Sequence, residues 1–299
     1  MVKKVCALAL CLSALSFSVS NVSHASDTTQ KSFLQRIKHE VNLGPDVSYI
    51  TYREPGVMKE RGWFYGIAAD AYLKYPLNKC WNLATGLEVK YAWSRVDYSS
   101  DESGLGAKYA TSRVDYSSDE SGDMDGIKDR LFEVRLLLGA EWFPYKNISF
   151  MPYVGFGYRK LTDDSSGKET DLGALGYKRT IRYFYVPIGI SGAYYINPNW
   201  KIKGYAEYDY FIRGKVKSYL SDIDPTLYED IKNTQDNGYG IRAGVSIVRN
   251  FKSFELSGGP YVKYWKIDKS DISYDSWGRE WVEPKNHSTE TGAMLRISF

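Results

Sequence analysis

The C-terminal stretch of the chain, residues 288–299, alternates between apolar and polar side chains. Phe299 and Ile297 fall on one face, whereas Ser298 and Arg296 fall on the other. A period of two is the period of a β-strand, because successive side chains of a strand point to opposite faces. We therefore predict a closing strand with one apolar and one polar face, which ends the chain on an aromatic residue.

The same alternation recurs along the chain and is clearest in residues 61–76, where Tyr65 and Ile67 alternate with Gly66 and Ala68. Ten strands are predicted in all, an even number, as a single-chain barrel with both ends on one side requires. We predict an all-β fold, an antiparallel ten-stranded transmembrane β-barrel. Its strands lie at about residues 40–54, 61–76, 81–96, 128–143, 148–162, 180–196, 200–217, 238–249, 253–268 and 288–299.

The connections between these strands alternate in length. Tight turns are predicted at residues 76–79, 144–147, 197–199 and 250–252, whereas long polar loops follow the third, fifth, seventh and ninth strands. Short turns on one side and long loops on the other are typical of outer-membrane barrels, with the turns in the periplasm and the loops outside the cell. A soluble β-sandwich has no reason to segregate its loops in this way.

Aromatic residues support a membrane location. The chain has 26 Tyr, and its aromatic residues make up 15% of the sequence. Many lie at the two ends of the apolar strand faces, where amphipathic rings favour the membrane–water interface. The predicted periplasmic girdle is Tyr75, Trp81, Trp142, Tyr194, Trp200, Phe254 and Phe299, and the outer one is Trp63, Tyr65, Tyr91, Trp93, Phe132, Phe184, Tyr210 and Tyr239.

The N-terminus has the pattern of a secretory signal peptide. Lys3 and Lys4 precede an apolar run, and Ser23 and Ala25 supply the small residues of a cleavage site. We predict a signal peptide at residues 1–25, a periplasmic N-terminal segment at 26–39 and an outer-membrane β-barrel at 40–299.

Composition excludes several classes of partner and fold. Removing Lys3 and Lys4 brings the formal net charge of +3 close to zero, which gives no reason to expect nucleic acid as a partner. Cys80 is then the only cysteine, so no intramolecular disulfide can form. No apolar run after residue 25 approaches the ~18 residues of a transmembrane helix, and this excludes a helical membrane protein.

The predicted inner face of the barrel carries charges of both signs. Barrels of about eight strands have interiors that side chains can fill, whereas 16 to 18 strands leave an aqueous channel. We therefore expect these charges to pair across a largely filled lumen, with a selective solute pathway as the alternative. They are Asp46, Asp70, Glu88, Lys90, Glu133, Arg135, Arg159, Lys203, Glu207, Asp209, Arg213, Arg242, Lys263, Glu290 and Arg296.

The second outer loop, which follows the third strand, contains a repeat, because residues 91–104 recur with one change at 109–122. A tandem duplication in an exposed loop costs little, and a duplicated surface epitope is the functional alternative. The loop ends with Ser121, Asp123 and Asp125, which approach a calcium-binding pattern. Ser121 replaces the first ligand and Phe132 the last, so we expect solvated charge here, or at most weak cation binding.

Taken together, these strands and the terminal Phe299 resemble the superfamily of porin-like outer-membrane barrels that includes the OmpX-type, opacity-type and omptin families. The resemblance covers residues 40–299 and rests on architecture, without a diagnostic motif. It implies an outer-membrane location in a Gram-negative bacterium, lipid and lipopolysaccharide as surroundings, and contact of the closing strand with the barrel-assembly machinery. It implies no activity.

Two enzyme families of this kind fit the residues poorly. Omptin catalysis uses an aspartate pair and an aspartate–histidine pair, but Asp222 and Asp224 have no histidine beside them. His287 is the only histidine expected at the outer rim, and the alternation points it towards lipid. A lipid A deacylase needs a histidine–serine pair, yet His287 and Ser288 are adjacent and point to opposite faces.

We therefore predict a monomeric, non-enzymatic surface protein, structural or adhesive, that acts through an extracellular ligand at its loops. These loops lie at about residues 97–127, 163–178, 220–237 and 269–286. A narrow porin-like channel for small solutes is the alternative, and an outer-membrane enzyme is disfavoured. The sequence predicts no catalytic residue, no cofactor and no metal site.

Overall fold

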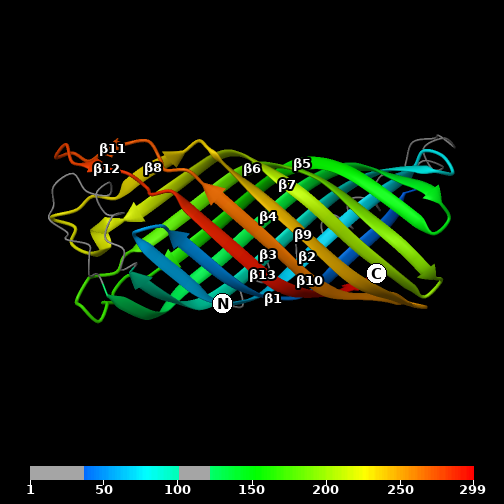
Figure 1. Ribbon diagram of the computed structural model, residues 1–299, viewed down its shortest axis with the longest axis horizontal. Coiled ribbons are helices and arrows are strands. Elements are labelled where there is room, and N and C mark those ends of the chain that lie inside the picture. Colours follow the sequence, from blue (N-terminus) through cyan, green and yellow to red (C-terminus); the bar gives the residue numbers. More distant parts are fainter. Residues whose placement is uncertain (1–36, 101–121) are drawn as a thin grey trace, which may run out of the picture. The chain divides into compact units, whose positions relative to one another are not determined.

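The computed structural model describes residues 37–100 and 122–299. Outside the described residues lie the predicted signal peptide, most of the predicted periplasmic segment, and residues 101–121, which include parts of both copies of the repeat. The described unit, Lys38–Phe299, is a closed barrel of ten antiparallel strands (Figure 1). They are β1 (Lys38–Glu54), β2 (Met58–Pro76), β3 (Trp81–Ser100), β4 (Asp123–Tyr145), β5 (Ile148–Asp164), β6 (Lys178–Asn197), β7 (Trp200–Tyr219), β9 (Gly238–Phe251), β10 (Phe254–Ile267) and β13 (Asn286–Ser298).

The first and last strands close the barrel. β1 pairs with β13, and the remaining strands pair in sequence order except that β7 pairs with β9. The predicted closing strand ends against β1, where the backbone N–H of Phe299 donates to the carbonyl of Val41 at 3.0 Å. Closure leaves no wall strand with an unpaired edge, as a sheet in hydrocarbon requires. The predicted ten-stranded barrel is confirmed.

Four smaller elements lie at the end with the long loops. They are a 3₁₀ turn η3 (Leu220–Asp222), the short strand β8 (Ile231–Gln235) and the two-residue strands β11 (Ser273–Tyr274) and β12 (Glu280–Trp281). In the described part of the chain, no helix is long and apolar enough to span a membrane. No strand was predicted within the loops at 220–237 and 269–286, where β8 and the β11–β12 pair lie. β3 and β4 also extend further than expected, so the loop that connects them is shorter than the predicted 97–127.

The outward face of the barrel is apolar between two aromatic girdles, as predicted. Leu136 and Ile188 are more than half exposed on this face. At the periplasmic end Trp81 and Trp142 stack with ring centroids 5.8 Å apart, and at the outer end Tyr49 meets Trp63 at 5.3 Å. Between the girdles the wall therefore has the aliphatic surface that a bilayer core requires.

Charges on the inward face pair across the lumen, as predicted. Arg242 donates to the Glu133 carboxylate at 3.0 Å and lies 2.7 Å from Asp209. Lys263 on β10 reaches the other oxygen of Glu133 at 2.9 Å, and Glu290 on β13 lies 2.6 Å from Lys90 on β3. Partners on distant strands compensate the cost of burying these charges.

One inward-facing charge was predicted wrongly. Arg213 lies on the outward side, where it forms an exposed ion pair with Asp236 at 3.2 Å. The register between β6 and β7 shifts at this point, because Phe184 is opposite Arg213 whereas Tyr185 is opposite Phe211. The additional residue, Ile212, is a β-bulge, which moves every following side chain of β7 to the other face.

Tyrosines on the inward face lie over glycines of neighbouring strands. A Cβ at Gly157 would lie 2.1 Å from the Tyr185 ring, and one at Gly292 would lie 2.6 Å from the Tyr261 ring. The hydroxyl of Tyr185 then donates to Glu133 at 2.8 Å, and that of Tyr261 to Asp46 at 2.7 Å. These rings bring an apolar surface into the lumen and keep their polar ends within the charge network.

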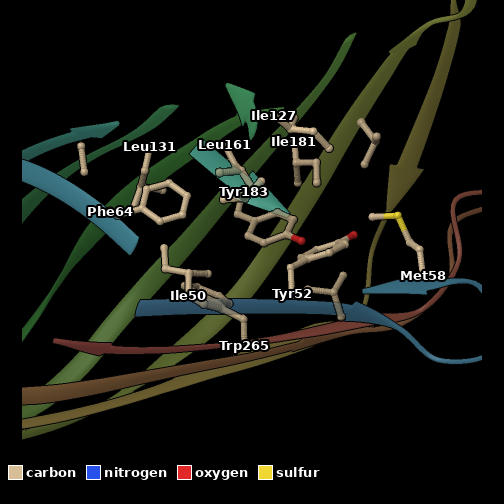
Figure 2. Packing of buried hydrophobic residues seen from close by; sticks show 14 of the residues in the cluster. Ile50, Tyr52, Met58, Phe64, Ile127, Leu131, Leu161, Ile181, Tyr183 and Trp265 are labelled. Carbon is tan, nitrogen blue, oxygen red and sulfur yellow. The ribbon is translucent and has the colours of Figure 1, made fainter. Parts of the chain in front are cut away.

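The extracellular end of the lumen is filled by a hydrophobic core that the sequence analysis did not predict. Ile50 and Tyr52 extend from β1 towards Leu161 and Ile181 on the opposite wall, and Trp265 closes the cluster from β10 (Figure 2). All five side chains are less than 10% exposed. The core closes the barrel at this end.

The periplasmic end of the lumen holds a polar cavity of about 280 Å³. Its lining includes charged side chains near the short turns, among them Glu40, Asp70, Lys74, Lys203 and Arg296. Members of the charge network, among them Lys90, Glu133 and Lys263, line the cavity as well. The barrel therefore contains a polar cavity, an ionic layer and an apolar plug.

The ionic layer predicts an asymmetric response to removal of one partner. Arg242→Leu leaves Glu133, Glu207 and Asp209 without their shared cation, and we expect it to reduce the free energy of unfolding by ~3–5 kcal/mol. Arg213→Leu breaks only an exposed pair and should cost at most ~1 kcal/mol. The measurement is a urea titration of heat-modifiable gel mobility, and equal midpoints for the two variants would contradict the network.

Candidate functional site: the extracellular platform

Two long loops fold together at the extracellular end of the barrel, at the left of Figure 1. One connects β10 to β13 and contains the β11–β12 hairpin, in which Ser273 pairs with Trp281. Gly278 makes the tight turn of this hairpin at φ +78°, a conformation that glycine adopts without strain. The other loop connects β7 to β9 and carries Leu227, Tyr228 and Glu229.

Asp275 organises the hairpin. Its carboxylate accepts hydrogen bonds from the backbone N–H of Trp277 at 3.0 Å and of Arg279 at 2.9 Å. It also accepts from Nε of Arg279 at 2.5 Å and from the indole N–H of Trp281 at 3.0 Å. One buried carboxylate thus fixes both the turn and two of its large side chains.

Arg279 joins the hairpin to the other loop. Its guanidinium lies over the rings of Trp277, Tyr228 and Trp281, at 4.7, 5.4 and 5.7 Å from their centroids. It also donates to the Leu227 carbonyl at 2.9 Å. We call residues 227–229 together with 273–281 the extracellular platform, because these contacts make them one unit.

The platform presents apolar surface to the outside. Tyr274 is 62% exposed, Trp277 is 55% exposed and Leu227 is 59% exposed. Large apolar side chains gathered on one exposed surface are typical of interaction sites. Aromatic side chains give a large contact area at low entropic cost, because each has only two rotatable bonds.

Hydrogen bonds anchor the platform to the barrel. β8 pairs with the end of β7, and the Asn233 amide donates to the Ser273 hydroxyl at 3.2 Å and to the Trp281 carbonyl at 3.0 Å. The backbone N–H of Asp271 donates to the Thr234 carbonyl at 3.1 Å. The platform is therefore an extension of the barrel wall.

Below the platform, Arg179 holds a cluster of buried carboxylates. It contacts Glu54 directly and lies 3.4 Å from Glu283, 3.6 Å from Glu60 and 3.6 Å from Asp163. Acids outnumber the cation, and one oxygen of Glu60 and one of Asp163 are buried without a hydrogen-bond partner. Within residues 37–100 and 122–299, no group of histidine, cysteine and acidic side chains is placed to hold a metal ion.

Glu283 connects this cluster to the loop that carries the platform. Its backbone N–H donates to the Ser270 hydroxyl at 2.8 Å, and its carbonyl accepts from the Ser270 N–H at 2.9 Å. Burial and the neighbouring Glu54 carboxylate raise the pKa of Glu283 to about 8, against the opposing effect of Arg179. The raised pKa favours the protonated form of the Glu283 carboxyl group at neutral pH.

The residues weighed for enzyme chemistry do not come together. Asp222 accepts the backbone N–H of Lys178 at 3.1 Å, and Asp224 accepts the N–H and the hydroxyl of Thr226 at 2.8 and 2.7 Å. His287 packs beside Tyr264 on the outward face, whereas its neighbour Ser288 is buried on the inward face. Asp222 and Asp224 thus support the local structure of the loop, and neither lies beside a histidine in sequence.

The calcium-like segment supports local structure as well. Ser121 lies outside the described residues, and Asp123 begins β4. The backbone N–H of Asp123 donates to the Asp171 carboxylate at 2.7 Å, and the Asp125 carbonyl accepts from Lys168 at 2.8 Å. These bonds tie β4 to the loop between β5 and β6. Weak cation binding here stays a prediction.

Sequence reasoning located the loops but missed the platform. The composition of residues 274–281 offered one signal, because two tryptophans, a tyrosine and an arginine stand around a turn with Asp275 and Gly278. Such a stretch favours a structured hairpin over a solvated loop. The contact with Tyr228 joins two loops that are distant in sequence, and no local pattern predicts it.

No protein-family model matches the sequence, and no curated protein matches it significantly. Among solved structures, the outer membrane protease OmpT from Escherichia coli aligns over 93% of this chain and 99% of its own, with a TM-score of 0.53 and 12% identity. The Pseudomonas putida toluene transporter TodX aligns over 87% of this chain and 89% of its own, at 0.40 and 10%. Ail, the attachment invasion locus protein of Yersinia pestis, aligns over 87% and 99%, at 0.30 and 11%.

The similarity to OmpT shows the fold alone, because identity is low. This fold is that of outer-membrane β-barrels, and its closed wall with an apolar outward band supports a location in the outer membrane of a Gram-negative bacterium. One fold can serve many activities, so the similarity leaves the activity of this protein open.

The protonated Glu283 predicts a pH dependence of stability. The folded barrel retains a proton on this carboxyl group that the unfolded chain releases, so the free energy of unfolding falls as pH rises from 4.5 to about 8. We expect the thermal midpoint of the wild type to decrease over this window and that of Glu283→Gln to decrease less. Parallel curves for the two proteins, followed by heat-modifiable mobility, would show that Glu283 does not titrate there.

Proposed function

We propose that this protein is a non-enzymatic surface protein of the outer membrane that binds an extracellular partner through its platform. The observation that carries the proposal is the exposure of Tyr274, Trp277 and Leu227 on loops held rigid by Asp275 and Arg279. A preorganised surface loses little conformational entropy on binding. The sequence analysis expected the function in the outer loops, and the platform supplies a defined surface within them.

The interior of the extracellular end favours a surface role. Trp265 and Tyr183 pack in the core with ring centroids 5.6 Å apart, and the Phe211 ring centroid lies 5.3 Å from that of Tyr183. Exposures of 1 to 4% show that these three rings are buried in the core. A solute that crossed here would have to displace a packed apolar cluster.

A catalytic role has little support from the residues weighed for it. Asp224 is engaged in its own turn, and His287 faces outward on β13. The carboxylates around Arg179 are buried below the platform, where a substrate would have to enter through the loops. We therefore retain the non-enzymatic proposal and place an outer-membrane enzyme last.

A narrow channel is the second candidate, and the polar cavity at the periplasmic end favours it. This cavity of about 280 Å³ has the charged lining of a solute pathway. It occupies only part of the lumen, because the hydrophobic core fills the extracellular end. Conduction would therefore require Trp265 and its neighbours to move.

The remaining partners stay predictions. The closing strand that ends at Phe299 is expected to meet the barrel-assembly machinery, and the barrel is expected to be a monomer surrounded by lipid and lipopolysaccharide. The signal peptide at residues 1–25 and the periplasmic segment at 26–39 are proposed on sequence alone.

The platform can be tested by removing its exposed aromatic side chains. We expect Tyr274→Ala with Trp277→Ala to lower binding at least ~10-fold, because the removal of two exposed aromatic anchors commonly costs more than ~1.4 kcal/mol. The assay is retention of cells that display the barrel on immobilised glycans and extracellular-matrix proteins.

The matched control is Leu172→Ala with Leu175→Ala, which removes two exposed apolar side chains from the loop between β5 and β6. This variant should bind as the wild type does. Asp275→Ala should weaken binding although it removes no exposed ring, because the hairpin loses its organising carboxylate. Full binding by the Tyr274 and Trp277 variant would exclude the platform.

The closed lumen predicts electrical silence. The refolded barrel should show no stable current steps in a planar bilayer, because the core leaves no continuous aqueous path. Heat-modifiable mobility of the same sample confirms folding. Reproducible steps would instead favour the channel, and they should then grow in Trp265→Ala, which removes the largest fully buried side chain of the core.

A further inference from the structure

Five buried carboxyl groups surround Arg179 below the extracellular platform. Arg179 on β6 is directly opposite Asp163 on β5, which is directly opposite Asp129 on β4. Glu54 at the end of β1 contacts Arg179, and Glu283 lies 3.4 Å from it. We call this group the Arg179 cluster, and each member is at most 5% exposed: Glu54, Glu60, Asp129, Asp163, Arg179 and Glu283.

The cluster has too little positive charge and too few donors for five ionised acids. Full ionisation would set five negative charges against one positive charge, a net charge of −4. One oxygen each of Glu60, Asp129 and Asp163 is buried without a hydrogen-bond partner. Burial disfavours the charged form of a carboxyl group, and a bound proton supplies the donor that a carboxylate lacks. The geometry of the cluster therefore favours retained protons.

The other titratable groups that face the cluster are phenols. Tyr52 on β1 donates to Glu54 at 2.8 Å, Tyr177 lies in the loop between β5 and β6, and Tyr183 lies on β6. Phenols in water ionise only near pH 10. The carboxyl groups are therefore the groups of this region that exchange protons near neutral pH.

Glu283 is the member of the cluster that lies outside the barrel wall. The other five lie on β1, β2, β4, β5 and β6, where ladder hydrogen bonds fix the backbone. Glu283 belongs to residues 268–285, which connect β10 to β13 and which we call the platform loop. Its backbone is held by two hydrogen bonds to Ser270, at 2.8 and 2.9 Å. Repulsion within the cluster would therefore displace the platform loop and leave the wall in place.

The charge of Glu283 changes within a defined pH range. Burial and the Glu54 carboxylate raise the pKa of Glu283 to about 8, against the opposing effect of Arg179. A carboxyl group with this pKa is roughly 1% ionised at pH 6 and roughly 90% ionised at pH 9. Ionisation places a second negative charge beside Glu54 in a buried site, where like charges repel more strongly than in water.

We propose that the Arg179 cluster is a proton-operated latch, which holds the platform loop against the barrel while Glu283 is protonated and releases it when Glu283 ionises. The closed wall persists in both states, because its ladder hydrogen bonds do not involve Glu283. Extracellular pH thus sets the order of the loop that carries Tyr274 and Trp277. The effect on the loop is independent of the proposed function, whereas any effect on binding rests on it.

The test follows a spin label on the platform loop, because the line shape of a nitroxide reports its mobility directly. The label is attached at Ile272→Cys in a Cys80→Ser background, and the native Ile272 side chain is 50% exposed, so the label stays outside the core. Spectra of the folded barrel in detergent are recorded from pH 6 to pH 9, with heat-modifiable mobility as the check of folding. The test variant is Glu283→Gln, and the matched control is Glu280→Gln, which neutralises an exposed acid of the same loop.

We expect the label in the parent protein to change from immobile to mobile with a midpoint near a pH of about 8. In Glu283→Gln the label should stay immobile throughout, because the amide has no acidic proton to lose. Glu280→Gln should behave as the parent does. Ser270→Ala removes the hydroxyl that accepts the Glu283 N–H, so its label should already be mobile at pH 6. This variant gives a readout if Glu283→Gln does not refold.

Three outcomes would overturn the latch. An equally immobile label at pH 6 and pH 9 in the parent would show that the loop is not released. An unchanged transition in Glu283→Gln would assign it to another group. Loss of the transition in Glu280→Gln would mean that surface charge, and not the cluster, moves the loop. A transition of the label in a barrel that binds no extracellular partner would support the latch and count against the proposed function alone.

Discussion

Backbone hydrogen bonding in hydrocarbon is the constraint on which this structure depends. An unpaired N–H or C=O costs several kcal/mol in a bilayer core, so a sheet there must close on itself. The pairing of β1 with β13 meets this requirement. Closure also separates an inside from an outside, and each inward charge must then find its partner within the barrel. The contacts of Arg242 with Glu133 and Asp209 follow from that separation.

Sequence could predict the wall because the membrane imposes a repetitive pattern on it. Alternation, tight turns such as the one after Pro76 and aromatic girdles are local features, and all three are present in the structure. Arg213 was misplaced because a single bulged residue inverts the alternation without changing composition. The pairing of Lys90 with Glu290 joins residues 200 positions apart, and only the closed barrel brings them together.

The site was less predictable than the fold for a related reason. Tyr228 and Arg279 belong to different loops, and their contact depends on how β8 extends β7. The inward tyrosines were not predicted, because the abundance of tyrosine was attributed to the aromatic girdles. Tyr185 over Gly157 shows a second use, in which a ring fills the space that a missing side chain leaves inside the barrel.

The hydrophobic core has a consequence for how the barrel is divided along its length. Near the periplasm, Leu136 faces outward and Arg135 inward, whereas near the outside Leu131 faces inward and Arg130 outward on the same strand. The polarity of β4 is thus inverted within a few residues. The extracellular portion of the barrel has an apolar inside and a polar outside, as a water-soluble barrel does, and the burial of apolar side chains stabilises it. It continues into the membrane-spanning portion, which has a polar inside and an apolar outside. The same sheet therefore faces water at its extracellular end and lipid over its membrane-spanning portion. The surface of the extracellular portion can change, as the surfaces of soluble proteins do, without a change in the portion that spans the membrane.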